Sequence, residues 1–230
     1  MQSDYHLDPV TGVWSQPGFQ SIDYSDGEET EQRLQHIIDT ASDISSLSPE
    51  LRPHCIDWPT TYHLSGLRAN ILRPFEITAE HEVLEIGAGC GALSRYLGEC
   101  GASVLALEGS LRRAHIARSR TRDLDNVAVV AEKLSTFKTP QQFDVVTLIG
   151  VLEYAALDDD ADDPAQVMLS KAASMLKPDG VVILAIENQL GLKYFAGAPE
   201  DHIGRPMYGL EGRYEKTQPR TYGRQDLVHL

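Results

Sequence analysis

The sequence predicts an α/β protein with a Rossmann-like parallel sheet flanked by helices. Five apolar runs typical of buried strands alternate with segments of helical periodicity. The runs are residues 82–86, 103–107, 127–131, 143–149 and 180–186. Alternating strands and helices are joined by right-handed crossovers, which place the strands parallel in one sheet. We therefore expect about five parallel strands in the order 3-2-1-4-5.

Apolar residues at helical spacing predict the helices. Two precede the sheet, at residues 29–45 and 65–72, and three lie between strands, at residues 91–100, 111–122 and 164–176. Residues 1–28 carry Pro, Gly, Ser and Asp and are expected to form an extended arm, anchored by its aromatic residues Tyr5, Trp14, Phe19 and Tyr24. We divide the chain into an N-terminal arm with helices covering the site, residues 1–75, and a Rossmann-like domain, residues 76–230.

Length and composition limit the function classes. The 230 residues suit one α/β domain with appendages. A formal net charge of -14 repels phosphate backbones, so nucleic-acid binding is not expected and small molecules or sugars are the expected substrates. The sequence lacks both the run of about 18 apolar residues that a membrane span needs and the features of a signal peptide, which predicts a cytoplasmic protein. The three cysteines have no metal-type spacing, so we predict no metal site.

A glycine-rich turn follows the first strand. Gly87, Gly89 and Gly91 allow backbone to approach a ligand closely at the carboxyl edge of the sheet. The same segment satisfies the dinucleotide pattern GxGxxA, which keeps an NAD-dependent oxidoreductase open. Glu108 ends the second strand, where a carboxylate can bind both ribose hydroxyls. Glu85 would repel a pyrophosphate but suits the positively charged amino-acid end of S-adenosylmethionine, and it therefore favours that cofactor.

Four segments together resemble the successive motifs of class I S-adenosylmethionine-dependent methyltransferases. They are EIGAGCG, LALEGS, FDVVTLIGVLEYA and LKPDGVVILAIEN, within residues 82–188. The resemblance implies that Gly87 and Gly89 line the methionine part of the cofactor and that Glu108 holds the ribose. It also implies that Glu132 borders the adenine and that Gly150 lies below the cofactor. Many members carry Asp just after the third strand where this chain has Ala-Glu, so backbone is the alternative source of the adenine contact.

The flanking segments resemble methyltransferase modules of bacterial surface-polysaccharide clusters, which are often fused or adjacent to glycosyltransferases. These segments are DWPTTYHLSGLRANILRPF before the core and ENQLGLKYFAGAPEDHIGRPMYGLEGRY after it. The resemblance implies a sugar or glycan hydroxyl as methyl acceptor and a glycosyltransferase as fused or adjacent partner. Both segments flank the carboxyl edge of the sheet. Their candidate acceptor-binding residues are Tyr62, Asn188, Tyr194 and Arg205.

A sugar hydroxyl is a poor nucleophile, and a general base adds about 10² to 10⁴ in rate. His63, in the arm that enters the domain, and His202, in the long loop after the fifth strand, can reach the carboxyl edge. Glu153 follows the fourth strand and is a further candidate. Each also has a purely structural interpretation, as a locally hydrogen-bonded histidine or as a capping or solvated carboxylate.

Class I methyltransferases close the sheet with two further strands, whereas this sequence ends at GRQDLVHL, which is typical of the first turns of the helix before them. We expect either a fragment of a longer polypeptide or a cover over the edge of the fifth strand, such as the second copy in a homodimer. A non-catalytic S-adenosylmethionine-binding or scaffolding module stays open for the same reason.

Overall fold

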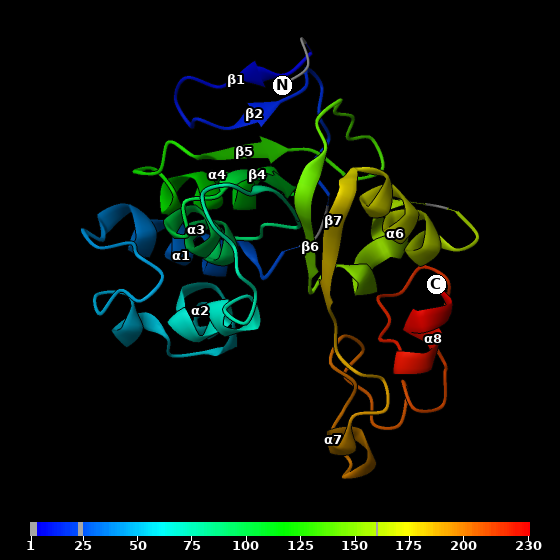
Figure 1. Cartoon of the computed structure of the whole chain (residues 1–230). Helices are drawn as coiled ribbons and strands as arrows, with labels where there is room; N and C mark the ends of the chain where they lie inside the picture. The colour runs from blue at the N-terminus through cyan, green and yellow to red at the C-terminus, as the bar shows by residue number, and fades with distance from the viewer. Residues whose placement is uncertain (1–3, 23–24, 160) are drawn as a thin grey trace.

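One sheet organises the fold (Figure 1). The computed structural model describes residues 4–22, 25–159 and 161–230, and within these the sheet has seven strands in the order β1-β2-β5-β4-β3-β6-β7. The strands are β1 (His6–Leu7), β2 (Trp14–Ser15), β3 (Glu82–Ile86), β4 (Ser103–Glu108), β5 (Val127–Ala131), β6 (Phe143–Ile149) and β7 (Leu176–Ala185). The α-helices are α1 (Glu28–Thr40), α2 (Trp58–Leu64), α3 (Ala92–Glu99), α4 (Leu111–Arg120), α5 (Ala155–Asp158), α6 (Pro164–Ser174), α7 (Leu192–Phe195) and α8 (Arg224–His229). Short 3₁₀ helices span Arg52–His54, Gly66–Ile71 and Leu152–Tyr154.

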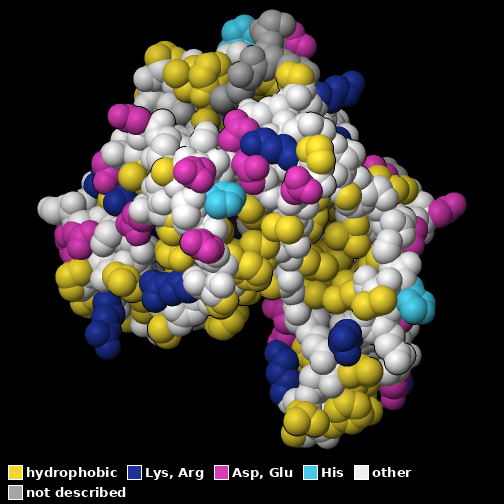
Figure 2. Space-filling view, viewed as in Figure 1, with side chains coloured by type: hydrophobic (Ala, Val, Ile, Leu, Met, Phe, Trp, Pro, Cys, Tyr) yellow, Lys and Arg dark blue, Asp and Glu magenta, His cyan; other side chains and the backbone are white. Residues whose placement is uncertain are grey.

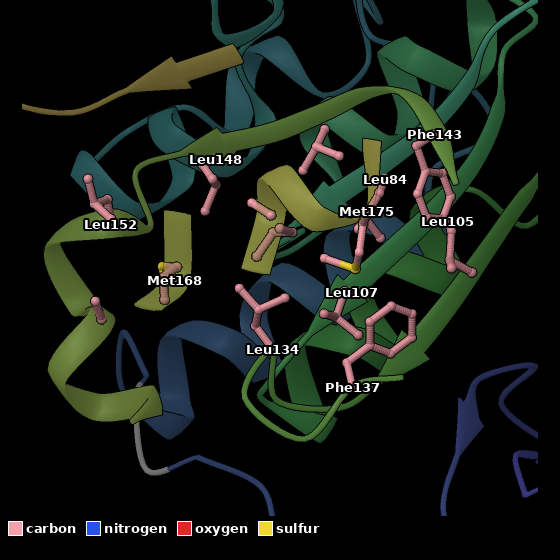
Figure 3. Close-up of a cluster of buried hydrophobic side chains, with 14 of the residues drawn as sticks. Leu84, Leu105, Leu107, Leu134, Phe137, Phe143, Leu148, Leu152, Met168 and Met175 are labelled. Atoms are coloured by element: carbon pink, nitrogen blue, oxygen red, sulfur yellow. The ribbon is translucent and has the colours of Figure 1, made fainter. Parts of the chain in front are cut away.

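The five central strands pair in parallel, in the predicted order. Successive residues of β3 enter different core clusters, Val83 with α3 and α4, and Leu84 with α6. Figure 3 shows the second cluster, in which side chains of β3, β4 and β6 meet those on and next to α6. Both faces of the sheet are therefore covered by helices, as expected for parallel strands that are apolar along their length. The Rossmann-like fold class is confirmed.

The strand count differs from the prediction because the N-terminal arm joins the sheet. β1 and β2 form an antiparallel pair, and Trp14 of β2 pairs in parallel with Val130 of β5. Strands of two residues are too short to show an alternating pattern in the sequence. Tyr5 is buried, and its ring meets that of Phe137 edge-on at a centroid distance of 6.3 Å. Tyr24 lies outside the described residues.

The first helix ends earlier than predicted. α1 stops at Thr40 rather than at residue 45, and the chain then turns away. The carboxylate of Glu50 accepts hydrogen bonds from the backbone N–H groups of Ser42 and Asp43, at 2.8 to 3.1 Å. A side chain that satisfies these amides competes with further helical turns.

Helix α2 was not predicted from the sequence. Asp57 and Thr60 form a capping box at its first turn, a signal that was not recognised. Tyr62 and His63, which were expected in the arm that enters the domain, lie on this helix. The helix predicted at residues 65–72 is instead the 3₁₀ helix Gly66–Ile71.

The chain after β7 forms a projecting lobe, residues 186–230, that carries α7 and α8 (Figure 1). α8 forms where the sequence predicted the start of a helix. Within the described residues no strand pairs with the outer edge of β7, where Val181 is exposed. No helix in the described part of the chain is long and apolar enough to cross a membrane.

Candidate functional site

The carboxyl ends of the central strands open into a cavity of about 420 Å³, a size usual for ligand sites. Its other walls come from α2 and from the lobe, and Figure 2 shows the molecule hollowed between the lobe and the body. Ten of the residues proposed from the sequence line it: Tyr62, His63, Glu85, Gly87, Gly89, Glu108, Glu132, Gly150, Glu153 and His202. Four do not: Gly91, Asn188, Tyr194 and Arg205.

The glycine turn between β3 and α3 has left-handed backbone at three positions, with φ of 73° at Gly87, 55° at Gly89 and 80° at Gly91. A Cβ on Gly91 would lie 2.7 Å from Cα of Ala117, so this glycine lets α3 approach α4. A Cβ on Gly89 would meet only the His63 ring, at 3.6 Å. Gly87 and Gly89 both line the cavity, and of the three glycines Gly89 is the one at which a Cβ would have room.

Two buried carboxylates lie beside this turn. Glu108 accepts hydrogen bonds from the amides of Gly89, at 2.6 Å, and Ser110, at 2.8 Å, and each of its oxygens keeps a second acceptor site for a ligand. Burial raises the pKa of Glu108. Burial also raises the pKa of Glu85 to about 8, and the charge of Glu108 adds to this effect. Ser94 donates its hydroxyl to Glu85. A cationic ligand group would stabilise both ionised carboxylates.

Glu132 and Gly150 complete the floor of the cavity. Glu132 turns back on its own loop, where its carboxylate accepts from the amide of Lys133 at 3.0 Å and from the hydroxyl of Thr136 at 2.6 Å. The adenine contact proposed for Glu132 stays a prediction, and backbone of this loop is the alternative. Gly150 directly follows β6 and has φ of 71°, and a Cβ there would lie 2.9 Å from the hydroxyl of Tyr62. Glycine therefore allows α2 to approach β6 closely.

Arg68 is a cavity residue that the sequence analysis missed. Its guanidinium stacks on the Tyr62 ring at 4.0 Å, donates to the Tyr62 hydroxyl and reaches the carbonyl of Ile149 at 3.4 Å. Its charge lowers the pKa of both Glu85 and Glu153 against the larger effect of burial. A lone arginine in a short 3₁₀ helix has no sequence signal, because only tertiary packing brings it to the strand ends.

His63 belongs to a buried ion network, which we call the N-terminal network: Asp26, Glu31, His63 and Arg113. His63 Nε2 lies 2.9 Å from Asp26, and Arg113 donates to Asp26 at 2.7 Å and to Glu31 at 2.8 Å. Burial lowers the pKa of His63, and Asp26 partly opposes this shift. These bonds tie α1 and α2 to α4, which favours the structural interpretation of this histidine.

Glu153 and His202 meet in a second group, the lobe cluster, together with Glu187. One ligand atom from each lies within 4.8 Å of the other two. Three of their atoms are buried and have no hydrogen-bond partner in the described part of the chain: Glu153 Oε2, Glu187 Oε2 and His202 Nε2. His202 Nδ1 lies 3.2 Å from the hydroxyl of Tyr154. Burial, and then the charge of Glu187, raise the pKa of Glu153 to about 8.

The remaining acceptor candidates lie in the lobe, away from the cavity wall. Tyr194 is buried and donates its hydroxyl to Asp201 at 2.5 Å, while Asn188 accepts from the amide of Leu190 at 3.0 Å. Arg205 is exposed. The lobe contributes Glu187, Lys193, Asp201 and His202 to the cavity instead. Contacts from Asn188, Tyr194 and Arg205 therefore stay predictions for an acceptor that extends beyond the cavity.

Comparison with known proteins agrees with this geometry. Residues 84–182 match the family described as Methyltransferase domain. The chain is similar to the ubiquinone biosynthesis O-methyltransferases of Stutzerimonas stutzeri, with 30% identity over 133 residues, and Saccharophagus degradans, with 28% over 132 residues. Each alignment covers 56% of this chain, and 53% and 52% of the two relatives. The chain thus spans about half the length of the curated relatives it matches.

The solved structure of DhpI in complex with SAM and HEP shares the fold. It aligns with a TM-score of 0.51 and 19% identity, over 90% of this chain and 88% of DhpI. The chain therefore has the Rossmann-like methyltransferase fold, and residues 84–182 match a methyltransferase domain, for which S-adenosylmethionine is the expected methyl donor.

Proposed function

We propose that this protein is an S-adenosylmethionine-dependent O-methyltransferase whose acceptor is a sugar or glycan hydroxyl. The observation that carries the activity is the pair of desolvated carboxylates, Glu85 and Glu108, beside the Gly89 turn in the matched domain. The ammonium and sulfonium groups of the cofactor suit this acidic cavity, whereas the pyrophosphate of NAD would be repelled. These features favour methyl transfer over the oxidoreductase alternative.

The acceptor class rests on separate arguments. The name O-methyltransferase of the relatives supports an oxygen acceptor. The resemblance of the flanking segments to surface-polysaccharide modules supports a sugar, and Trp58 and Tyr62 of α2 offer aromatic faces in the cavity for a sugar ring. A glycosyltransferase partner and a homodimer remain proposals that follow from the flanks and from the open edge of β7.

When bound, S-adenosylmethionine supplies a methyl group already activated by its sulfonium. The chain then has to position the acceptor oxygen and exclude water. We place the acceptor hydroxyl at the lobe cluster, because His202 Nε2 and Glu153 Oε2 have no hydrogen-bond partner among the described residues. His63, which is bound to Asp26, is the weaker candidate for a base.

Binding and turnover test the proposal together. Calorimetry should show S-adenosylhomocysteine binding and no comparable binding of NAD. Protein given methyl-labelled cofactor should then label glycans in a panel of sugars, glycans and phenols. Binding without transfer to any acceptor would support the non-catalytic module instead, and preferential labelling of phenols would reject the sugar acceptor.

A further inference from the structure

We propose that the lobe cluster, Glu153, Glu187 and His202, binds one divalent metal ion of the zinc or manganese class in the wall of the cavity. The three residues come from separate parts of the chain. Glu153 follows β6, Glu187 follows β7, and His202 lies in the lobe. The sequence shows no metal-type spacing among them, so only the fold brings them together.

The three ligand atoms are close enough to bind one metal ion after a small side-chain movement. The three ligand atoms lie within 4.8 Å of one another, and His202 Nε2 is 3.9 Å from Glu187 Oε2. Around a tetrahedral zinc with bonds of about 2.0 to 2.2 Å, neighbouring ligand atoms are about 3.3 Å apart. Bringing atoms that lie up to 4.8 Å apart to this spacing needs a side-chain movement of about 1.5 Å. Glu187 can make it, because 40% of its side chain is exposed.

The unsatisfied atoms are the second observation. Glu153 is only 3% exposed, and its Oε2 has no hydrogen-bond partner. Glu187 Oε2 and His202 Nε2 are also buried and have no hydrogen-bond partner among the described residues. Buried polar atoms without partners are costly, and a proton shared between two of these atoms would leave the third unsatisfied. A single cation satisfies all three.

The surroundings of His202 also suit a metal ligand. Its Nδ1 lies 3.2 Å from the Tyr154 hydroxyl, and a proton on Nδ1 would be donated to that oxygen. Such a bond fixes the ring and leaves the Nε2 lone pair for the metal, as partners of metal-binding histidines commonly do. The Tyr154 and His202 rings also pack edge-on, at a centroid distance of 5.2 Å.

The donor set selects the kind of ion. One imidazole nitrogen and two carboxylate oxygens suit zinc or manganese, and three protein ligands leave positions open, as in catalytic zinc sites. The cluster lines the same cavity as Glu108 and Gly89, so an open position would face the acceptor.

The role of the ion in catalysis rests on the proposed function, whereas its binding does not. A cation beside the acceptor hydroxyl would lower the pKa of that hydroxyl, and its proton would leave to water. The oxygen–methyl bond would then form as the sulfur–methyl bond breaks, and the electron pair of the broken bond would stay on sulfur as S-adenosylhomocysteine. This step replaces a histidine or glutamate base with a metal-activated hydroxyl.

Metal titration of the full chain tests the site directly. Chelator-treated protein should bind one Zn²⁺ by calorimetry and one Mn²⁺ by electron paramagnetic resonance. Glu153→Gln, Glu187→Gln and His202→Ala should each weaken binding by more than about 100-fold, because losing a direct ligand costs more than the 10- to 100-fold typical for an outer-shell partner. The matched control is Glu211→Gln, which removes an exposed lobe carboxylate paired with Arg213 and should leave the affinity unchanged.

Titration of the same samples with S-adenosylhomocysteine separates this proposal from the proposed function. Folded variants should keep their cofactor affinity while losing the metal. Wild-type protein that binds S-adenosylhomocysteine but no stoichiometric metal would overturn the metal site alone. Equal metal affinity in wild type and in all three variants would also overturn it. Wild-type protein that binds metal but no S-adenosylhomocysteine would overturn the proposed function and leave the site standing.

Discussion

The N-terminal network and the lobe cluster each contain two carboxylates and one histidine, but only the N-terminal network also contains an arginine. In the first, Arg113 donates to both Asp26 and Glu31. In the second, no Arg or Lys among the described residues forms an ion pair with either glutamate, and three buried atoms have no hydrogen-bond partner. Residue type alone therefore does not distinguish a structural group from a functional candidate. The two groups differ in whether an arginine or lysine side chain is directly paired with their carboxylates.

The largest expected effect is on the N-terminal network. Arg113→Met should lower the free energy of unfolding by about 3 kcal/mol, because it breaks a buried pair and leaves Glu31, which is 1% exposed, with a poorer partner. Urea unfolding measures the loss. The matched control is Arg112→Met, since Arg112 also contacts Glu31 but its side chain is 46% exposed, and its removal should cost less than about 1 kcal/mol. Equal losses of unfolding free energy in the two variants would contradict the inference that the Arg113 ion pairs are buried and the Arg112 pair is exposed.

Replacing the two histidines should have opposite effects on stability and turnover. His63→Ala should lower the free energy of unfolding by about 2 to 3 kcal/mol, because it removes a buried partner of Asp26. Turnover should change less than about tenfold. His202→Ala should change stability by less than about 1 kcal/mol and lower turnover by about 10² or more. Unfolding and labelled methyl transfer, measured on both variants, check this. The reverse pattern would assign catalysis to His63.

Glu108 combines features of both regions, since it is hydrogen-bonded to backbone and also has lone pairs to offer a ligand. Glu108→Ala should weaken S-adenosylhomocysteine binding by roughly 1.5 to 3 kcal/mol, through loss of charge-assisted hydrogen bonds. Glu82→Ala, at the opposite end of the sheet, is the control and should bind normally. Calorimetry measures S-adenosylhomocysteine binding by both variants, and thermal unfolding verifies that both are folded. Unchanged affinity in the Glu108 variant would remove this residue from the site.

The smallest effect is a difference in pH dependence. The pKa of Glu153 is raised to about 8, so in metal-free protein its protonated form is favoured and stability is lost as the pH rises from about 4.5 to 8. Glu153→Gln, which mimics the protonated acid, should raise Tm by about 2 to 4 °C at pH 8.5 and barely change it at pH 5.

The N-terminal network should respond to pH in the opposite direction. The pKa values of His63 and Asp26 are both lowered, so this network loses stability as the pH falls below about 6.5 and again below about 3.8. The control for Glu153→Gln is Glu211→Gln, which removes an exposed carboxylate and should leave Tm close to the wild-type value. An equal gain for Glu153→Gln at both pH values would show that this carboxyl is not desolvated.

Local sequence patterns determined most of the central fold. Apolar runs predicted the five parallel strands and their order. The glycine turn was predictable because glycine is the residue that adopts positive φ most readily. The strand ends carrying Glu85, Glu108, Gly150 and Glu153 were predictable for the same reason, because parallel strands share one carboxyl edge. The two-residue strands of the arm and the capped helix α2 were missed because their signals are short.

Only the tertiary structure decided which polar groups are satisfied. Asp26 and Arg113 are 87 residues apart in the chain, yet together they hold His63 in place. Glu187 gave no signal in the sequence, but the fold buries one of its oxygens beside Glu153 and His202. Hydrogen bonding and desolvation depend on distances of a few ångströms between segments far apart in the chain. The roles of the two histidines, equivalent as sequence candidates, therefore depend on packing.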